Sequence, residues 1–210
     1  MHHCRDISAL LKDQRIERAV VLGHSLGALI GLALAARYPD RVDWLILVDG
    51  GGKLSEEQTK KVFAGIQPTL DRLGKVFPSR EAYLDLMKKN PLLQPWNQAL
   101  EAYYLYELED VEGGVRSRVR PEHIKEEAEN LAKFDVTEFY PKVECPVLIL
   151  RATEGMQSLD DILLHEEAIK RMLREIPDAR CLNLQGTNHY SIVFQPDKIR
   201  DKAILGFLEQ

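Results

Sequence analysis

The stretch Gly23-His24-Ser25-Leu26-Gly27 places a serine where a run of strand-forming residues gives way to a Leu- and Ala-rich segment. A serine held on a sharp turn between a strand and a helix exposes its hydroxyl as a nucleophile for acyl transfer. We expect side chains at Gly23 and Gly27 to collide with neighbouring backbone. We also expect the Leu26 backbone N–H to donate to an oxyanion. The pattern predicts nucleophilic chemistry at Ser25, which requires a base.

The hydrophobic pattern on both sides of this serine alternates between helices and buried strands. Helices are predicted at residues 5–14, 26–37, 165–176 and 198–208, and strands at residues 19–22, 41–50, 145–152 and 179–186. The strands are continuous apolar runs, which is typical of parallel strands covered by helices on both faces. This order predicts an α/β fold with a mainly parallel sheet.

Residues 50–140 have a different texture, with no strand-like run and frequent Gly and Pro. Helices are predicted there at residues 56–67, 80–89, 98–109 and 122–134. The basic residues Arg116, Arg118 and Arg120 are interpreted as a solvated loop. The sequence therefore predicts a helical insertion, residues 50–140, within a core formed by residues 1–49 and 141–210.

Three segments resemble the α/β-hydrolase fold superfamily, in its esterase, lipase and C–C hydrolase branch. They are residues 19–50, from AVVLGHSLG to LILVDG, the strand PVLIL at 146–150, and GTNHYSIVFQPDKIRDKAILGFLEQ at 186–210. The resemblance covers nearly the whole chain. It implies an α/β-hydrolase sheet, a serine nucleophile at Ser25, a cap domain in residues 50–140, and no metal or organic cofactor.

The resemblance also implies that His189, after the last strand, is the catalytic base. The other histidines are interpreted differently: His24 packs inside the serine turn, and His123 and His165 are solvated. The acid is expected after the strand at 145–152, where the loop is long and Gly155 stands at the usual aspartate position.

Four residues are candidates for this acid. The stretch DILLHEEA, which begins at Asp161, is similar to family segments in which the acid precedes a short apolar step into a helix. We therefore predict Asp161 as the third member of the triad. Asp160, Glu154 and Asp49 remain alternatives, the last because some relatives carry the acid one strand earlier.

The predicted cap is rich in aromatic residues, which are Trp96, Tyr103, Tyr104, Tyr106, Phe63 and Phe77. Such residues at helical spacing are more often a domain's own core, but a cap over a nucleophile also encloses an apolar pocket. We predict that Trp96, Tyr103 and Tyr104 bind substrate. The expected activity is cleavage of small to medium apolar carboxylic esters through an acyl-enzyme. The alternatives are C–C or lactone hydrolysis with the same triad, and a non-catalytic module that binds a ligand or a partner.

Only 22 residues precede Gly23, whereas the resemblance implies further strands and a second oxyanion donor before the serine turn. The strand near Ala19 would then be an exposed apolar edge. We expect a partner segment, or a second copy in a dimer, to cover it.

The composition excludes several classes of protein. A net charge of −5 with scattered basic residues argues against nucleic-acid binding. The apolar run 19–36 is interrupted by Gly23 and Gly27, and the N-terminus lacks the apolar core of a signal peptide. Three cysteines without metal-ligand spacing predict reduced thiols. A cytoplasmic protein that binds neither membrane nor nucleic acid is expected.

Overall fold

The computed structural model describes residues 2–155 and 161–210, apart from the side chains of Phe63, Pro68 and Ala132. The chain divides into two compact units, Met1–Gln58 with Asp135–Gln210, and Thr59–Phe134. The second unit is shorter at both ends than the insertion predicted at 50–140. The reason is local: the Tyr140 hydroxyl donates to the Gly51 carbonyl at 2.7 Å, and Lys53 pairs with Asp135, so both connecting segments pack within the first unit.

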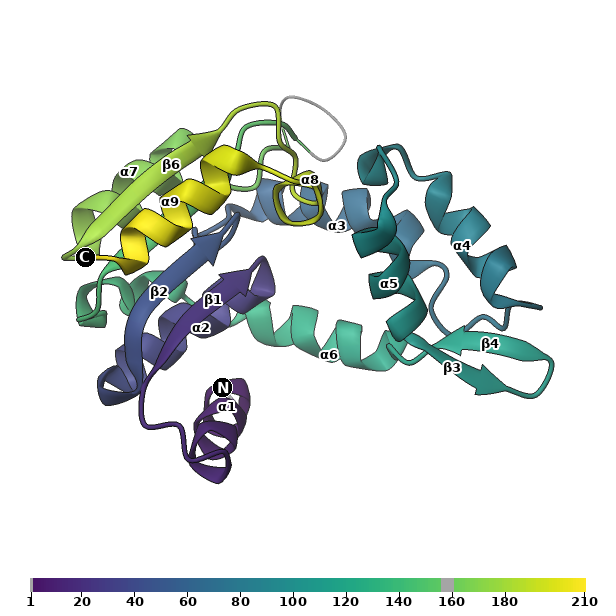
Figure 1. The fold of residues 1–210 in the computed structure, drawn as a ribbon, viewed down its shortest axis with the longest axis horizontal. Coiled ribbons are helices and arrows are strands. Elements are labelled where there is room, and N and C mark those ends of the chain that lie inside the picture. Colours follow the sequence, from purple (N-terminus) through teal and green to yellow (C-terminus); the bar gives the residue numbers. More distant parts are fainter. Residues whose placement is uncertain (1, 156–160) are drawn as a thin grey trace. The chain divides into compact units, whose positions relative to one another are not determined.

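The first unit contains a parallel four-stranded sheet in the order β1-β2-β5-β6. Figure 1 shows β1 at one edge of this sheet, beside β2. The strands are β1 (Ala19–His24), β2 (Val42–Val48), β5 (Val147–Ala152) and β6 (Ala179–Leu184). The helices are α1 (His2–Asp13), α2 (Leu26–Arg37), α7 (Glu166–Glu175), α8 (Ser191–Phe194) and α9 (Lys198–Leu208), with short 3₁₀ turns at Pro39–Arg41, Val136–Glu138 and Tyr140–Lys142. The predicted α/β class with a parallel sheet is confirmed.

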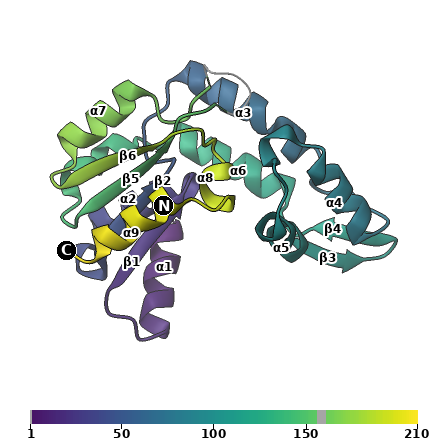
Figure 2. The same ribbon diagram turned by 45° about the horizontal axis from the view of Figure 1, so that its top comes forward.

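Helices cover both faces of the central strands, as the continuous apolar runs predicted. Ile46 and Val48 of β2 belong to a buried cluster that includes Phe207 of α9. Leu45, on the opposite face of the same strand, lies against Gly31 of α2. Figure 2 shows α7 and α9 on opposite sides of β5 and β6. Alternation of side chains along β2 therefore supplies two hydrophobic layers from one apolar run.

The edge strand β1 is covered less completely. Val20 and Leu22 are 45% and 53% exposed, although they pair in register with Trp44 and Ile46 of β2. The helix α9 packs on β5 and β6. This exposed apolar face corresponds to the edge expected from the sequence, and its partner stays a prediction.

The second unit contains a β-hairpin between helices. Its elements are most of α3 (Glu56–Leu70), α4 (Arg80–Lys88), a 3₁₀ turn at Pro91–Leu93, α5 (Gln98–Tyr106), β3 (Leu108–Val111), β4 (Gly114–Ser117) and α6 (Pro121–Ala132). Figure 1 shows β3 and β4 side by side. The expectation that this region has no strands is wrong.

The turn of the hairpin depends on two consecutive glycines. Gly113 and Gly114 have φ values of 85° and 144°, which L-residues with a side chain rarely adopt. They reverse the chain between Glu109 and Arg116, which face each other and form an ion pair with N···O 2.7 Å. Arg116 is thus part of a strand, and its interpretation as a loop residue is wrong.

No helix among the described residues is long and apolar enough to cross a membrane. The apolar run 19–36 is instead the strand β1 followed by α2. Cys4, Cys145 and Cys181 are all free thiols, and Cys4 and Cys145 are buried.

Candidate active site

Ser25 stands on a strained turn between β1 and α2. Its φ of 56° and ψ of −119° lie in a region that non-glycine residues rarely adopt, and such strain concentrates at functional sites. The turn is held at both ends, because the Ser25 N–H donates to the Val48 carbonyl at 3.1 Å and the Ala28 N–H donates to the Ser25 carbonyl at 3.0 Å. The predicted strand–turn–helix around Ser25 is present.

Only one of the two flanking glycines is required by steric contacts. A Cβ at position 23 would lie 2.2 Å from the Gly27 carbonyl oxygen, so Gly23 permits the close crossing of the turn. A Cβ at position 27 would have nothing within 4 Å among the described atoms. The prediction of a collision is therefore wrong for Gly27. Its backbone carbonyl is instead the group that a side chain at position 23 would strike.

Leu26 is the first residue of α2. The first N–H groups of a helix have no intrahelical acceptor, so the Leu26 N–H is free to donate to a substrate oxygen beside Ser25. Its role as an oxyanion donor stays a prediction.

His189 lies in the loop after β6 and is 8% exposed. Its Nδ1 is 2.7 Å from Oδ2 of Asp49. A carboxylate only accepts hydrogen bonds, so Nδ1 carries the proton and Nε2 keeps a lone pair that can act as a base. The Asn188 side chain fixes the loop by accepting from the N–H groups of Tyr190 and Ser191, at 2.9 and 2.8 Å.

Asp49 follows β2 and is 1% exposed. Its Oδ1 accepts from the Ala152 N–H at 3.2 Å, and its own N–H donates to the Leu150 carbonyl at 2.8 Å. Its φ is 42°, a second strained position. A Cβ at the next residue, Gly50, would lie 2.5 Å from the Ser25 carbonyl oxygen, so the Asp49 turn packs directly on the serine turn.

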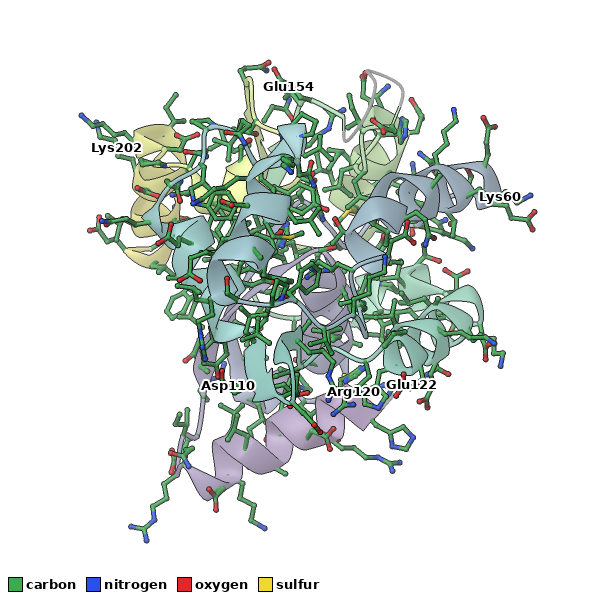
Figure 3. The ribbon with its side chains drawn as sticks, turned by 90° about the vertical axis from the view of Figure 1, so that its right-hand side faces the viewer. Lys60, Asp110, Arg120, Glu122, Glu154 and Lys202 are labelled. Carbon is green, nitrogen blue, oxygen red and sulfur yellow. The ribbon has the colours of Figure 1, made fainter. Side chains whose placement is uncertain are left out.

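The acid beside His189 is thus Asp49, and the prediction that Asp161 faces this histidine is wrong. Asp161 is buried, but it is Asp49 that accepts the hydrogen bond of His189 Nδ1. Glu154 is exposed at the outer end of the loop after β5 (Figure 3). Asp160 lies outside the described residues.

The reason for this error lies in the topology. Strands β2 and β5 are parallel neighbours, so the residues after both strands lie at the same carboxyl edge of the sheet. The last residue of β5, Ala152, contributes a backbone N–H donor, and the turn after β2 contributes the carboxylate. The spacing of the acidic residues along the chain does not show whether the carboxylate comes from the segment after β2 or from the segment after β5.

His24 makes specific contacts with the histidine loop, which its interpretation as packing missed. Its Nε2 is 2.9 Å from the His189 carbonyl oxygen, and the two imidazole rings are tilted by 34° with centroids 4.4 Å apart. Burial, followed by the proximity of His189, lowers the pKa of His24 to about 4. The ring is therefore neutral at physiological pH.

These contacts place the serine turn and the His189 loop at the same edge of the sheet. Ser25 Oγ and the His189 ring, both within the described residues, do not form a direct hydrogen bond. The predicted approach of the two groups stays a prediction.

The remaining histidines lie elsewhere in the two units. His123 on α6 is exposed, as predicted. His165 is only partly exposed, and its Nε2 is buried without a hydrogen-bond partner in the described part of the chain, so its interpretation as solvated is wrong.

The aromatic residues proposed for substrate binding lie in the second unit and pack on one another. Tyr104 is buried, with its ring stacked on Trp96 at 5.8 Å and edge-on to Tyr103 at 5.3 Å. Tyr104 therefore belongs to the unit's own core, which argues against direct contact with substrate. For Trp96, which is partly exposed, and Tyr103, which is exposed, substrate binding stays a prediction.

Within residues 2–155 and 161–210, no three side chains of His, Cys, Asp or Glu gather in a way that could hold a metal ion.

The residues of the candidate site lie at the ends of the sheet strands. Ser25, Asp49 and His189 follow β1, β2 and β6, and Ala152, which ends β5, donates to Asp49. All four strands thus contribute at their carboxyl ends.

Comparisons with known proteins show which family the chain resembles. A model of the Alpha/beta hydrolase family matches residues 2–202. A protein of Caulobacter sp. named "Putative carbamate hydrolase RutD" is 29% identical over 203 residues, which are 97% of this chain and 70% of the relative. The 2-(acetamidomethylene)succinate hydrolase of Mesorhizobium japonicum is 27% identical over 204 residues, 97% of this chain and 69% of the relative.

Solved structures show the same fold. The crystal structure of E-2-(acetamidomethylene)succinate hydrolase superposes with a TM-score of 0.84 at 24% identity, over 99% of this chain and 72% of that chain. A marine microorganism esterase superposes with a TM-score of 0.67 at 23% identity, over 96% of this chain and 75% of that chain. The chain thus spans about 70% of the length of these relatives. With the matched family model and the strand–turn–helix at Ser25, these findings show that the chain belongs to the alpha/beta hydrolase family.

Proposed function

We propose that this hydrolase cleaves carboxylic esters of small to medium apolar substrates through an acyl-enzyme on Ser25. The observation that carries the proposal is the hydrogen bond of 2.7 Å between His189 Nδ1 and the buried Asp49 carboxylate. It leaves His189 Nε2 as a base at the sheet edge where the strained Ser25 turn lies.

The reaction follows from the properties of these groups. Ser25 Oγ attacks the carbonyl carbon of the ester while His189 Nε2 takes the hydroxyl proton. The Asp49 carboxylate stabilises the resulting imidazolium, and the Leu26 N–H at the start of α2 donates to the oxyanion. His189 then returns the proton to the leaving alcohol, and the carbon–oxygen bond of the ester breaks. Water, deprotonated by the same histidine, hydrolyses the acyl-enzyme and regenerates Ser25.

A second candidate function is hydrolysis of an amide-type carbon–nitrogen bond with the same groups. The relatives named as carbamate and 2-(acetamidomethylene)succinate hydrolases favour it. The difference lies in the leaving group, because an amine needs the proton from His189 before the bond breaks, whereas many alcohols or phenols leave more readily.

A fluorophosphonate probe tests the nucleophile directly. We expect the purified 210-residue chain to form one covalent adduct, located on Ser25 by peptide mass spectrometry. The variant Ser25→Ala is expected to form none. Ser8→Ala is the matched control, since Ser8 lies on α1 and belongs neither to the serine turn nor to the histidine loop. An unlabelled wild-type chain, or labelling that survives Ser25→Ala, would refute the proposal and favour a non-catalytic binding module.

A pair of substrate series then separates the two bond types. One series is p-nitrophenyl esters of increasing acyl length, which break a carbon–oxygen bond, and the other is p-nitroanilides of the same acids, which break a carbon–nitrogen bond. We expect the highest kcat/KM for short to medium acyl esters. A higher kcat/KM for the anilides than for the matched esters would favour the second candidate.

A further inference from the structure

We propose that His24 is a positioning residue that joins the serine turn to the His189 loop through a hydrogen bond from its Nε2–H to the His189 carbonyl. This inference rests on the proposed function, because it assigns a role to a group beside the nucleophile and the base. His24 is the last residue of β1 and precedes Ser25 directly. A displacement of the His189 backbone relative to β1 would therefore break this bond.

The direction of the hydrogen bond follows from the acceptor. The His189 carbonyl oxygen can only accept, so His24 Nε2, at 2.9 Å, must carry the proton. The neutral His24 ring is thus the Nε2–H tautomer, with an unprotonated Nδ1. This is the opposite tautomer from that of His189, whose Nδ1–H faces Asp49.

The contact between the His24 and His189 rings requires that His24 stay uncharged while His189 is protonated. In the proposed reaction His189 becomes an imidazolium, and the His24 ring lies 4.4 Å away. A second cation at that distance would oppose proton transfer to His189. The titratable groups that act on His24 are His189 and Asp49, and burial together with His189 keeps the pKa of His24 at about 4. His24 therefore holds the base in place without competing for its charge.

Two variants separate the hydrogen bond from the ring contact. His24→Phe keeps a planar ring but has no donor, whereas His24→Gln places an amide N–H near the position of Nε2 and lacks the ring. His123→Gln, an exposed histidine on α6, is the matched control. We expect His24→Phe to lower the rate of fluorophosphonate labelling of Ser25 about tenfold, the typical effect of one lost hydrogen bond in a network. His24→Gln and His123→Gln should stay within about threefold of the wild type.

Nitrogen-15 NMR of the histidine-labelled full-length chain gives a readout that does not depend on activity. In the wild type at pH 7 we expect His24 as the neutral Nε2–H tautomer and a downfield proton signal from the His189 Nδ1–H bonded to Asp49. That signal should be retained in His24→Gln and broadened by exchange in His24→Phe. This spectroscopic change separates positioning of the base from a merely structural effect on stability.

Each outcome decides the inference. An Nδ1–H tautomer for His24 in the wild type would overturn it, and this measurement needs no variant. Equal labelling rates and equal His189 signals in the wild type and His24→Phe would also overturn it, as would a His24→Gln variant as impaired as His24→Phe. If the wild-type chain is not labelled at all, the proposed function fails, while the tautomer and the His189 signal still test whether His24 positions the loop.

Discussion

The two units each bury a network of charged and aromatic side chains. The two networks differ in how completely their hydrogen-bonding groups are paired. In the second unit, Arg72 donates to both Glu107 oxygens at 2.7 and 3.0 Å and to the Tyr83 hydroxyl at 2.6 Å. Its guanidinium also lies over the rings of Tyr83 and Tyr104. The charges cancel and the strong donors have partners, so this cluster is structural.

In the first unit, the Asp49 carboxylate pairs with a histidine, whose ring can gain and lose a proton, instead of a permanent cation. The backbone is strained at both Ser25 and Asp49, whereas the positive φ values of the second unit belong to glycines, which are Gly74, Gly113 and Gly114. One imidazole nitrogen and one helix N–H keep their capacity to bond. The two networks therefore differ in that the one proposed to be reactive is incompletely satisfied and held by strained turns, whereas the structural one is equally buried but fully paired.

The largest expected effect tests which carboxylate completes the reactive network. We expect Asp49→Asn to lower kcat/KM for p-nitrophenyl esters about 10³–10⁴-fold, because the amide stabilises the wrong tautomer of His189 and no imidazolium. Asp161→Asn is the matched control and should change kcat/KM by less than about threefold. Equal losses in the two variants would contradict the assignment of Asp49.

The structural network should respond in stability instead. Arg72→Met leaves the buried Glu107 carboxylate without its cation, which destabilises the fold by about 3–5 kcal/mol. Urea unfolding measures this change, and hydrogen exchange should locate it within Thr59–Phe134.

The combined variant Arg72→Met, Glu107→Leu, Tyr83→Phe removes all three polar partners of that network. It should recover most of the lost stability, since no buried charge remains unpaired. No analogous apolar replacement of Asp49 and His189 should recover activity. A triple variant as unstable as Arg72→Met would show that the cluster is not a replaceable structural element.

The strained turns can be tested with paired glycine substitutions. Gly50→Ala places a Cβ 2.5 Å from the Ser25 carbonyl oxygen, so the two turns must separate. We expect about 2–3 kcal/mol of destabilisation and a large loss of Ser25 labelling. Gly27→Ala has open space and lies inside α2, so it should be neutral or stabilise by up to about 1 kcal/mol. A destabilising Gly27→Ala would contradict the open space at this position.

The smallest expected effect concerns pH. The pKa of His24 is about 4 in the folded chain and near 6.5 in the unfolded chain. Between these values the unfolded state binds the proton first, so the free energy of unfolding falls as the pH falls from about 6.5 to about 4. His24→Gln should reduce this loss, by at most about 3 kcal/mol, when urea unfolding at pH 7 and pH 4.5 is compared. His123→Gln should behave as the wild type does, and an unchanged loss in His24→Gln would place the titration elsewhere.

Much of the fold could be predicted because its signals are local. Helices α2 and α9 have the predicted bounds, and the apolar runs at β2 and β5 predicted strands covered on both faces. The β3–β4 hairpin was missed because its strands have four residues each, too few for a clear alternation. The Gly113-Gly114 pair was the available signal for that turn.

The sequence by itself determined the strand–turn–helix at Ser25, since the spacing of Gly23 and Ser25 at the end of an apolar strand is a property of consecutive residues. It also determined that a histidine follows the last strand. Only the tertiary structure decided which carboxylate meets that histidine, because the parallel sheet brings the end of β2 to the same edge as the ends of β5 and β6, although Asp49 and His189 are 140 positions apart in the chain. The same long-range packing places the His189 carbonyl on His24, a contact between residues 165 positions apart in the chain that no local pattern encodes.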